Sequence, residues 1–363
     1  MKRVGNIFEK IIDINNIELA IMKASKGKTN RPSVQKIMDN SRYYAIEIQK
    51  MLLEKTYVPS PYVEMIIHDG VRKKERTIFK PHFYPDQCIH WALMLQIEEV
   101  LMKKMYVWNC ASIKGRGLHY GANHIKKVLI EDRKNTKYAL KLDVRKFYPS
   151  INKKILKEKF RRIFKDEKLL WLLDEIIDSA EDGVPIGNYT SQWFANFYLN
   201  DLDHYIKEEL GIKHYIRYMD DMLLFSNNKK ELHRIKDKIE EYLNNELDLK
   251  LKGNWQLFKT ESRPIDFLGY RFNRNPETKE VYITLRKSNF LRFKRRIRKI
   301  SKKFILTPHD ASAVISIYGW ISKSNGYNYV KKYISEYIDI KKCKEVISNE
   351  TRKQSKANKQ IRN

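Results

Sequence analysis

Cysteine is scarce in this 363-residue sequence, in which Cys88, Cys110 and Cys343 are far apart. An odd number of widely spaced cysteines excludes both a disulfide framework and a cysteine-based zinc site, and it indicates a reducing compartment. No hydrophobic run reaches the length of a membrane span, and the N-terminal stretch MKRVGNIFEKIIDINN carries acids and amides where a signal peptide is apolar. These absences predict a soluble, cytoplasmic protein with no membrane partner.

Acidic residues are few relative to basic ones, since 72 Lys and Arg outweigh 44 Asp and Glu and give a formal net charge of +28. The excess runs along most of the chain, which predicts a polyanionic partner. Charge alone leaves open a basic surface without catalysis. The hydrophobic fraction of 42%, with 22 Tyr and 15 Phe, excludes a disordered chain, and the length predicts two or three packed units.

The pattern of apolar residues predicts a mixture of helices and strands. Residues 1–65 read as helices broken by the turn-rich KASKGKTNRPS, and Ile89, Leu93 and Ile97 are spaced as in a helix over 86–105, with Asp86 as its cap. A similar stripe marks a helix near residues 232–243. Short strand-like runs lie between and after these helices: TIF, YALKLDV, HYIRYMDDMLLFS, FLGYRF and VYITL. The fold class is therefore α+β.

A strongly basic helix is expected near the C-terminal end. The stretch Arg286 to Lys303 contains ten basic residues and no acid, with apolar residues on or near one face: Phe290, Leu291, Phe293, Ile297 and Ile300. Such a one-sided excess favours an anionic partner, although a solvated charged face is the alternative. The last stretch, from about Glu345, is polar and Lys-rich and is expected to fray. We expect four segments: 1–65, 66–284, 285–345 and a flexible basic tail over 346–363.

Two adjacent acids form the first part of a candidate active site. In HYIRYMDDMLLFS, Asp220 and Asp221 separate two apolar strand-like arms, which predicts a hairpin with both acids at its tip. Adjacent acids are also ordinary in turns, so the pair needs a partner. Asp143 supplies one, because Leu140 and Leu142 alternate with polar residues up to the end of that strand. Two divalent ions about 4 Å apart require such oxygen ligands, converging from separate strands.

At these residues the chain resembles the reverse transcriptases. LKLDVRKFYPSI resembles their motif A, YMDD their motif C, GVPIGNYTSQWFANFYLNDLD their motif B, and KGNWQLFKTESRPIDFLGYRF their motifs D and E, while KKERTI and SIKGRGLHYGANHI look like their basic finger motifs. The resemblance covers about residues 70 to 335. It implies a right-hand polymerase fold with an N-terminal helical leader, fingers and a palm with an antiparallel sheet over 66–284, and a basic helical thumb over 285–345.

The family also implies roles for individual residues around two Mg²⁺ ions. Asp143 and Asp220 would ligate both ions, the Val144 carbonyl would add a ligand, and Asp221 would be a secondary ligand. Lys259 matches a lysine that could protonate the leaving pyrophosphate.

A second set of residues would bind the substrates, deoxynucleoside triphosphates and an RNA template with its cDNA or primer. Tyr148 matches the aromatic residue that excludes a ribose 2′-hydroxyl. Arg76, Lys114 and Arg116 match finger cations, and the Phe267 to Tyr270 stretch would form a strand gripping the primer end, with Gly269 allowing close approach. Each cation could instead be a surface residue, and Tyr148 could instead be a packing residue.

Motif B suggests the subtype. Intron-type enzymes usually have a Gln before the glycine and a Ser-Pro pair after it, whereas this chain has Ile186-Gly187 and Ser191-Gln192. The resemblance also implies that these four residues of motif B contribute to substrate binding. That form looks like the reverse transcriptases of diversity-generating retroelements, as do KASKGKTNRPSV and SIYGWISKSNGYNYV. The resemblance implies error-prone copying of a template repeat RNA at adenines, and a small helical-bundle accessory protein as partner. The alternatives are a retron or group II intron-like enzyme, a template-independent antiphage nucleotidyltransferase, and a non-catalytic RNA-binding relative.

Overall fold

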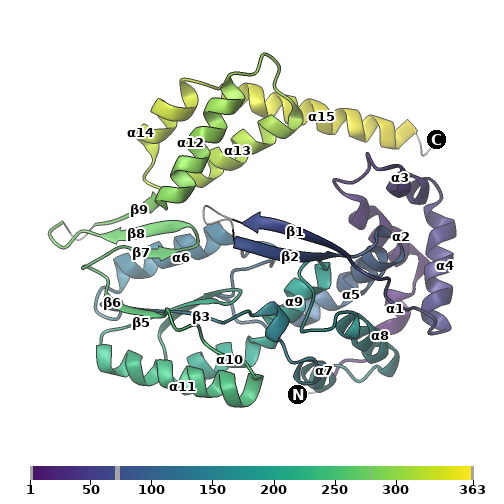
Figure 1. Ribbon diagram of the computed structural model, residues 1–363, viewed down its shortest axis with the longest axis horizontal. Coiled ribbons are helices and arrows are strands. Elements are labelled where there is room, and N and C mark those ends of the chain that lie inside the picture. The colour runs from purple at the N-terminus through teal and green to yellow at the C-terminus, as the bar shows by residue number, and fades with distance from the viewer. Residues whose placement is uncertain (1–2, 70–73, 279, 361–363) are drawn as a thin grey trace. The chain divides into compact units, whose positions relative to one another are not determined.

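The computed structural model describes residues 3–69, 74–278 and 280–360, and it confirms the mixed helix and strand content (Figure 1). Its helices are α1 (Phe8–Ile11), α2 (Ile14–Ser25), α3 (Pro32–Asp39), α4 (Ser41–Leu53), α5 (Cys88–Lys104), α6 (Leu118–Glu131), α7 (Lys153–Ile163), α8 (Glu167–Asp178), α9 (Tyr189–Tyr198), α10 (Asn200–His204), α11 (Lys229–Leu247), α12 (Lys287–Ser301), α13 (Pro308–Ser322), α14 (Tyr327–Val330) and α15 (Ile340–Gln360). Its strands are β1 (Val63–Asp69), β2 (Lys74–Lys80), β3 (Tyr138–Asp143), β4 (His214–Tyr218), β5 (Asp221–Ser226), β6 (Gln256–Lys259), β7 (Ile265–Phe267), β8 (Tyr270–Arg274) and β9 (Val281–Leu285).

The chain forms two compact units, each built from several stretches of the sequence, and the four predicted segments stay a prediction. Unit 1 contains residues 1–117, 141–224 and 230–256, and unit 2 contains residues 118–140, 225–229 and 257–363. In the part of the chain that the structure describes, no helix is long and apolar enough to cross a membrane.

The N-terminal helices belong to the core of unit 1. Helix α2 packs on α4 and α5, and the buried Asn16 side chain donates hydrogen bonds to the carbonyl oxygens of Ile11 at 2.9 Å and Ala92 at 3.1 Å. The predicted stripe on α5 is confirmed, because Ile89 and Ile97 are fully buried. Burial of these apolar faces joins the predicted leader to the middle of the chain.

The predicted cap of α5 is wrong. Asp86 lies in an extra helical turn before α5, where it is buried and accepts hydrogen bonds from the Tyr57 hydroxyl at 3.0 Å and the Ser60 N–H at 3.2 Å. A buried carboxylate needs hydrogen-bond partners, and these come from the segment before β1 rather than from the helix end.

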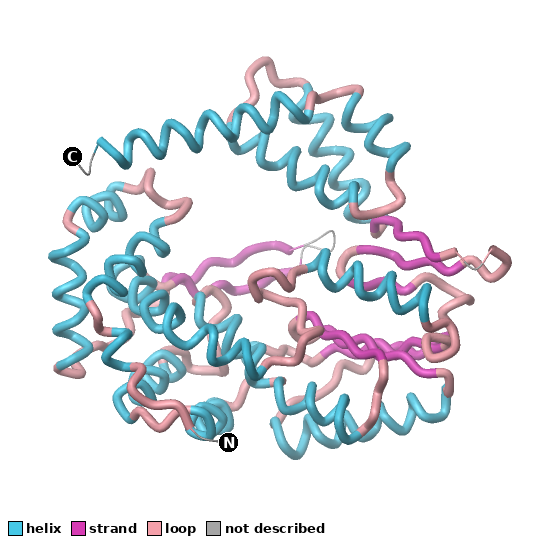
Figure 2. The backbone as a smooth tube through the Cα atoms, turned by 180° about the vertical axis from the view of Figure 1, so that it is seen from behind, coloured by secondary structure: helices cyan, strands magenta, loops and turns pink. Residues whose placement is uncertain are grey.

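The strands form three sheets (Figure 2), and the pairs β1–β2, β7–β8 and β8–β9 are antiparallel. Strand β1 pairs with β2, the strand order of the largest sheet is β4-β5-β3-β6, and β7-β8-β9 form a third sheet. The predicted FLGYRF strand is interrupted, because Leu268 and Gly269 have φ values of 54° and 77° and turn the chain between β7 and β8. Positive φ at both central residues is typical of a tight hairpin turn, so Leu268 and Gly269 form the turn, Phe267 ends β7 and Tyr270 begins β8.

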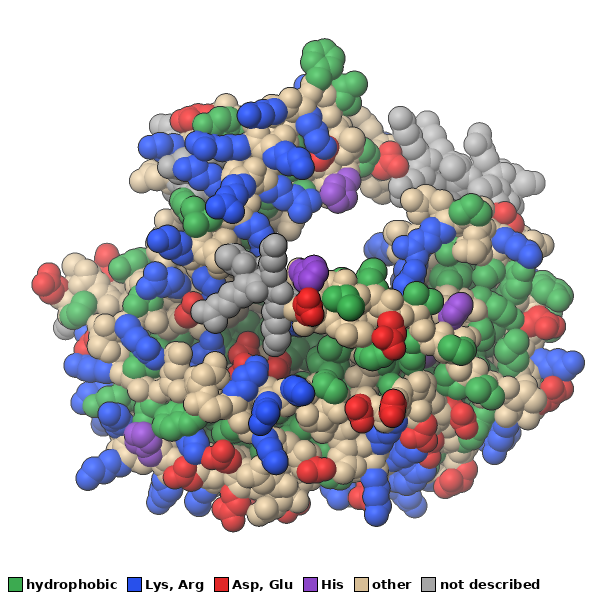
Figure 3. Space-filling view, viewed as in Figure 1, with side chains coloured by type: hydrophobic (Ala, Val, Ile, Leu, Met, Phe, Trp, Pro, Cys, Tyr) green, Lys and Arg blue, Asp and Glu red, His purple; other side chains and the backbone are tan. Residues whose placement is uncertain are grey.

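The C-terminal helices form a second hydrophobic core within unit 2. The apolar face of α12 buries Phe293, Ile297 and Ile300 against α13, whereas Leu291, near that face, is exposed. Lys and Arg side chains gather over this part of the chain (Figure 3). The predicted flexible tail is instead largely helix α15, because Cys343 is buried and Val346 and Ile347 pack on the same core; residues 361–363 lie outside the described residues.

Candidate active site

The end of β3 and the β4–β5 hairpin bring two acids together. Alternation along β3 buries Leu140 and Leu142 and leaves Asp143 partly exposed at the strand end. Strand β5 pairs with β3 and with β4, so the turn at Met219 and Asp220 lies at the edge where β3 ends. The Asp143 carboxylate lies near enough to Asp220 to raise the pKa of Asp220 by charge repulsion. The predicted meeting of these two acids is therefore present in the structure.

The hairpin turn has an uncommon backbone conformation. Met219, its first central residue, has a φ of 54°, which the tightest hairpin turns require but non-glycine residues seldom adopt. The Met219 carbonyl oxygen accepts a hydrogen bond at 3.0 Å from the guanidinium of Arg217. A buried side chain thus holds the turn that carries Asp220.

The acid pair is electrostatically suited to a cation. Burial, and then the neighbouring carboxylates of Asp143 and Asp221, raise the pKa of Asp220 to about 7. The Oδ1 oxygen of Asp143 is buried without a hydrogen-bond partner. A divalent ion would supply the missing partner and offset the repulsion, so this donor set fits magnesium, which binds through one or two carboxylates.

Two acids, Asp143 and Asp220, support a metal site here, and Asp221 is not shown to be a third ligand. Among the described residues, no three His, Cys, Asp or Glu side chains are arranged as a metal-binding group. Asp221 is the first residue of β5 and acts on Asp220 electrostatically. Its role as a ligand stays a prediction.

Val144 directly follows Asp143 and pairs with the segment after α11, and its role as a metal ligand stays a prediction. It forms an antiparallel bridge with Leu251, flanked by hydrogen bonds from the Arg145 N–H to the Lys250 carbonyl and from the Lys252 N–H to the Asp143 carbonyl, both of 2.8 Å. In a pair flanked in this way, the carbonyls of the two central residues point away from each other's strand. The Val144 carbonyl is therefore directed away from the Leu251 segment.

Lys252 is a site residue that sequence reasoning missed. Its ammonium donates to the Oδ2 oxygen of Asp143 and forms an ion pair with it, and both side chains are about one-quarter to one-third exposed. Lys250 and Lys252 alternate with buried Leu249 and Leu251, which was the available signal that both lysines lie on the polar face.

Tyr148 lies beside the β4–β5 hairpin. Its hydroxyl is 3.7 Å from the Sδ atom of Met219, and burial together with the Asp220 carboxylate raises the pKa of Tyr148 to about 12. Arg76, an exposed residue of β2, is near enough to act on the Tyr148 hydroxyl electrostatically. The structure thus brings Arg76, Tyr148 and the acid pair into one region of unit 1.

Two glycines fix the segment that contains Ile186. The Tyr148 carbonyl oxygen accepts from the Val184 N–H at 3.1 Å, and a Cβ on Gly183 would lie 2.1 Å from the same oxygen. The Ile186 carbonyl oxygen accepts from the Phe79 N–H at 2.8 Å, and a Cβ on Gly187 would lie 2.1 Å from the Phe79 carbonyl oxygen. Residues 183–187 therefore contact both the stretch after Asp143 and strand β2.

The comparisons with known proteins agree with this geometry. A family described as "Reverse transcriptase (RNA-dependent DNA polymerase)" matches residues 71–272, more than half of the chain. The chain belongs to the reverse transcriptase family. It is also similar to the Retron Ec73 reverse transcriptase of Escherichia coli, with 27% identity over 169 residues, which cover 42% of this chain and 50% of that protein. The chain thus spans about half the length of the curated relative it matches.

The remaining reverse transcriptase residues are less tightly connected to the acids. Ser191 is buried in α9, and Gln192 next to it is exposed. Burial raises the pKa of Glu98, and the charge of exposed Lys114, in the segment before α6, offsets part of that rise. Arg116 donates weakly to the Tyr106 carbonyl at 3.5 Å. Their substrate-binding roles stay predictions.

Lys259 of unit 2 forms an ion pair with Glu261 at 3.3 Å. Of the two lysines near the predicted motif D, Lys252 is the one that the structure shows on Asp143. Protonation of pyrophosphate by Lys259 stays a prediction.

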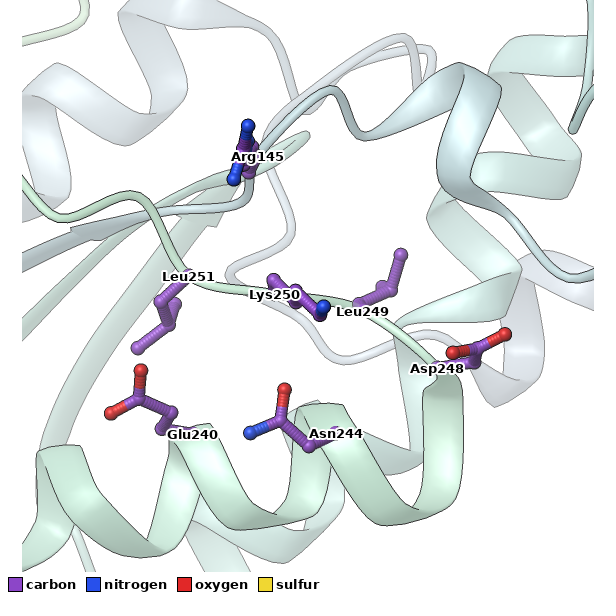
Figure 4. A pocket seen from close by; sticks show the side chains of 7 residues that line it. All are labelled: Arg145, Glu240, Asn244, Asp248, Leu249, Lys250 and Leu251. Atoms are coloured by element: carbon purple, nitrogen blue, oxygen red, sulfur yellow. The ribbon is translucent and has the colours of Figure 1, made fainter.

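A pocket of about 350 Å³ lies behind the turn that follows Asp143 (Figure 4). Its lining mixes cations, acids, an amide and leucines: Arg145, Glu240, Asn244, Asp248, Leu249, Lys250 and Leu251. It contains none of the reverse transcriptase residues predicted from the sequence. Because its charges are of both signs, it offers no concentrated site for a phosphate or a metal.

Proposed function

We propose that the chain is an RNA-directed DNA polymerase whose active site is built on Asp143 and Asp220. The observation that carries this proposal is the close approach of two partly buried acids, Asp143 at the end of β3 and Asp220 in the β4–β5 turn, in a chain that belongs to the reverse transcriptase family. Magnesium ions held there would activate the primer 3′-hydroxyl and stabilise charge on the leaving pyrophosphate. Asp143, Asp220 and the Val144 carbonyl would hold them, and template RNA, primer and deoxynucleoside triphosphates are the partners.

The protein's own groups orient the substrates in this proposal. The Tyr148 ring, fixed beside Met219, would occupy the space of a ribose 2′-hydroxyl. Arg76 would bind triphosphate oxygens through its planar guanidinium. The four-stranded sheet supports reading this region as the palm of a right-hand polymerase, with β1–β2 as part of the fingers and α12 in the thumb.

The test is primer extension on an RNA template by the parent and by Asp143→Asn and Asp220→Asn. We expect both variants to lose essentially all extension while their RNA affinity changes little, because an amide is a poorer ligand for magnesium than a carboxylate. Asp237→Asn is the matched control, since Asp237 is 73% exposed on α11. Substantial extension by either active-site variant would contradict the assignment.

The finer proposal is a polymerase of a diversity-generating retroelement that copies a template repeat RNA with errors at adenines. Ile186-Gly187 and Ser191-Gln192 support it. A small helical-bundle accessory protein would then be a further partner. The second candidate is a retron-type enzyme, which the similarity to the Retron Ec73 reverse transcriptase favours.

Ile186→Gln distinguishes these candidates through the error spectrum. A polar group beside the new base pair penalises a misfit when it is left unpaired, by about 1–3 kcal/mol, whereas an aliphatic group imposes no such penalty. We therefore expect the parent's cDNA to carry substitutions opposite template adenine, and fewer in the variant. Accurate copying by the parent would favour the retron reading, and identical adenine errors in both proteins would remove Ile186 as the cause.

A further inference from the structure

A buried arginine is bonded to the turn that carries Asp220. Arg217 lies on β4, two residues before Met219, and its side chain is fully buried. Its Nε–H donates to Asp203 Oδ1 at 2.7 Å, and its terminal nitrogens donate to Asp203 Oδ2, to Asn196 Oδ1 and Asn196 O at 3.2 Å each, and to Met219 O at 3.0 Å. A guanidinium has five N–H groups, so every one of them has an acceptor here.

The acceptors come from three different elements. Asn196 is on α9, the helix of motif B, Asp203 is on α10, and Met219 is in the hairpin turn. The network extends further, because the Asn196 amide donates to the Ala111 carbonyl at 2.8 Å and the Tyr215 hydroxyl donates to Asp203 at 2.7 Å. Asn196, Asp203 and Arg217 are all fully buried.

Stability alone does not account for such a network. A fully buried ion pair costs much desolvation, and apolar side chains of similar volume often give an equally stable protein. What an apolar replacement cannot do is donate to the Met219 carbonyl. That bond fixes a residue whose φ of 54° is unfavourable and which directly precedes Asp220.

We propose that Arg217 is a positioning residue, which holds the Met219 turn on α9 and α10 and so places the Asp220 carboxylate for metal binding. This inference rests on the proposed function for the role of Asp220 in polymerisation. Groups that orient metal ligands typically change metal affinity or activity by about 10- to 100-fold when removed. We expect a change of the same size in metal affinity when Arg217 is replaced.

Two variants separate positioning from folding. Arg217→Lys keeps a positive charge near Asp203, but one ammonium lacks the fork that spans Asp203, Asn196 and Met219. The triple variant Asp203→Leu, Tyr215→Phe, Arg217→Met removes the buried charges and the Tyr215 hydroxyl together, and so avoids an unpaired carboxylate. Both are compared with the parent in thermal unfolding, in Mn²⁺ titration by electron paramagnetic resonance, and in single-nucleotide extension.

Arg274→Met is the matched control. The Arg274 guanidinium is also buried, and donates within unit 2 to the Thr136 hydroxyl at 2.7 Å, the Thr260 hydroxyl at 3.1 Å and the Leu129 carbonyl oxygen. It should lower the thermal midpoint without changing Mn²⁺ affinity. An equal loss of Mn²⁺ affinity in this control would overturn the proposal, because general destabilisation would then suffice.

We expect the folded Arg217 variants to bind Mn²⁺ about 10- to 100-fold more weakly and to lose kcat by a similar factor, with little change in the nucleotide KM. Parent-like Mn²⁺ affinity and kcat in a folded variant would overturn the proposal. Loss of folding in both variants would also overturn it, because the network would then serve the fold itself. If the parent extends no primer, the proposed function fails, while the Mn²⁺ comparison still decides the role of Arg217.

Discussion

Lys252 contacts Asp143 twice, because its ammonium pairs with the Oδ2 oxygen and its main-chain N–H donates to the Asp143 carbonyl at 2.8 Å. The main-chain bond fixes where Lys252 lies, and the side chain adds a positive charge beside an acid pair that would otherwise repel itself. In the absence of metal, the ammonium thus takes a place that a cation would fill.

Lys252→Met should therefore make the protein more dependent on magnesium. Without divalent ions, we expect a loss of about 1 kcal/mol in the free energy of unfolding, since the partly exposed pair is screened by water. Magnesium should then stabilise the variant more than the parent, because no ammonium competes for Asp143. Lys250→Met is the control, since exposed Lys250 is two residues away. If magnesium raised the free energy of unfolding by the same amount in all three proteins, this competition would be contradicted.

Asp220 should make the metal-free protein less stable as pH rises. Its pKa of about 7 in the folded protein is above the ordinary value of 3.8, so the folded state binds the proton more tightly than the unfolded state. Protonated Asp220 adds to the free energy of unfolding below pH 4, on the order of 4 kcal/mol, and this contribution is lost as pH rises through 7. In chelator, Asp220→Asn should remove this decline between pH 4 and 8. A parent whose unfolding free energy does not fall over that range would contradict the raised pKa.

Tyr148 should control the choice of sugar. Tyr148→Ala opens the space beside Met219, and we expect it to improve ribonucleotide incorporation relative to deoxynucleotide incorporation by about 10- to 100-fold, which corresponds to about 1–3 kcal/mol. Tyr148→Phe keeps the ring and should stay close to the parent. An unchanged ratio in Tyr148→Ala, measured from kcat/KM for both nucleotides, would make Tyr148 a packing residue.

The exposed cations of α12 should bind the nucleic-acid backbone. Arg292→Gln, Arg295→Gln and Arg296→Gln together should flatten the plot of log affinity against log salt concentration, by about 0.7 to 0.9 for each phosphate that the protein no longer neutralises. Three exposed cations of unit 1, Lys154, Arg162 and Lys238, provide a control with the same loss of charge. If both triple variants gave the same slope, the effect would come from net charge alone, and direct phosphate binding by α12 would be contradicted.

The spacing of apolar residues along the sequence correctly predicted the strands that carry the two acids. Alternation along β3 and the apolar arms around the Asp220 turn were sufficient to predict the meeting of Asp143 and Asp220. The hairpin at Leu268 and Gly269 was missed because an uninterrupted apolar pattern does not report a positive φ. Helix α15 was missed because the burial of Cys343 depends on distant helices.

The second layer of the site was beyond sequence reasoning. Arg217 is in a strand whose neighbours are apolar, where an arginine reads as a surface residue, and its partners are 14 and 21 residues away. Asp203 and Asn196 carry no pattern that pairs them with it. Such networks depend on which helices pack against which strand, and this packing arises only when the whole unit folds.

The two glycines around Ile186 bear on how this enzyme can change over evolutionary time. A side chain at Gly183 or Gly187 would collide with a backbone carbonyl at 2.1 Å, so both positions are closed to substitution without a shift of the main chain. Ile186 lies between them on a backbone that is already fixed, and its side chain is partly exposed. Single-codon changes can therefore alter the chemistry of this side chain while leaving the loop in place. If Ile186 contacts the new base pair as proposed, copying accuracy could be changed at this one position while the fold stays the same.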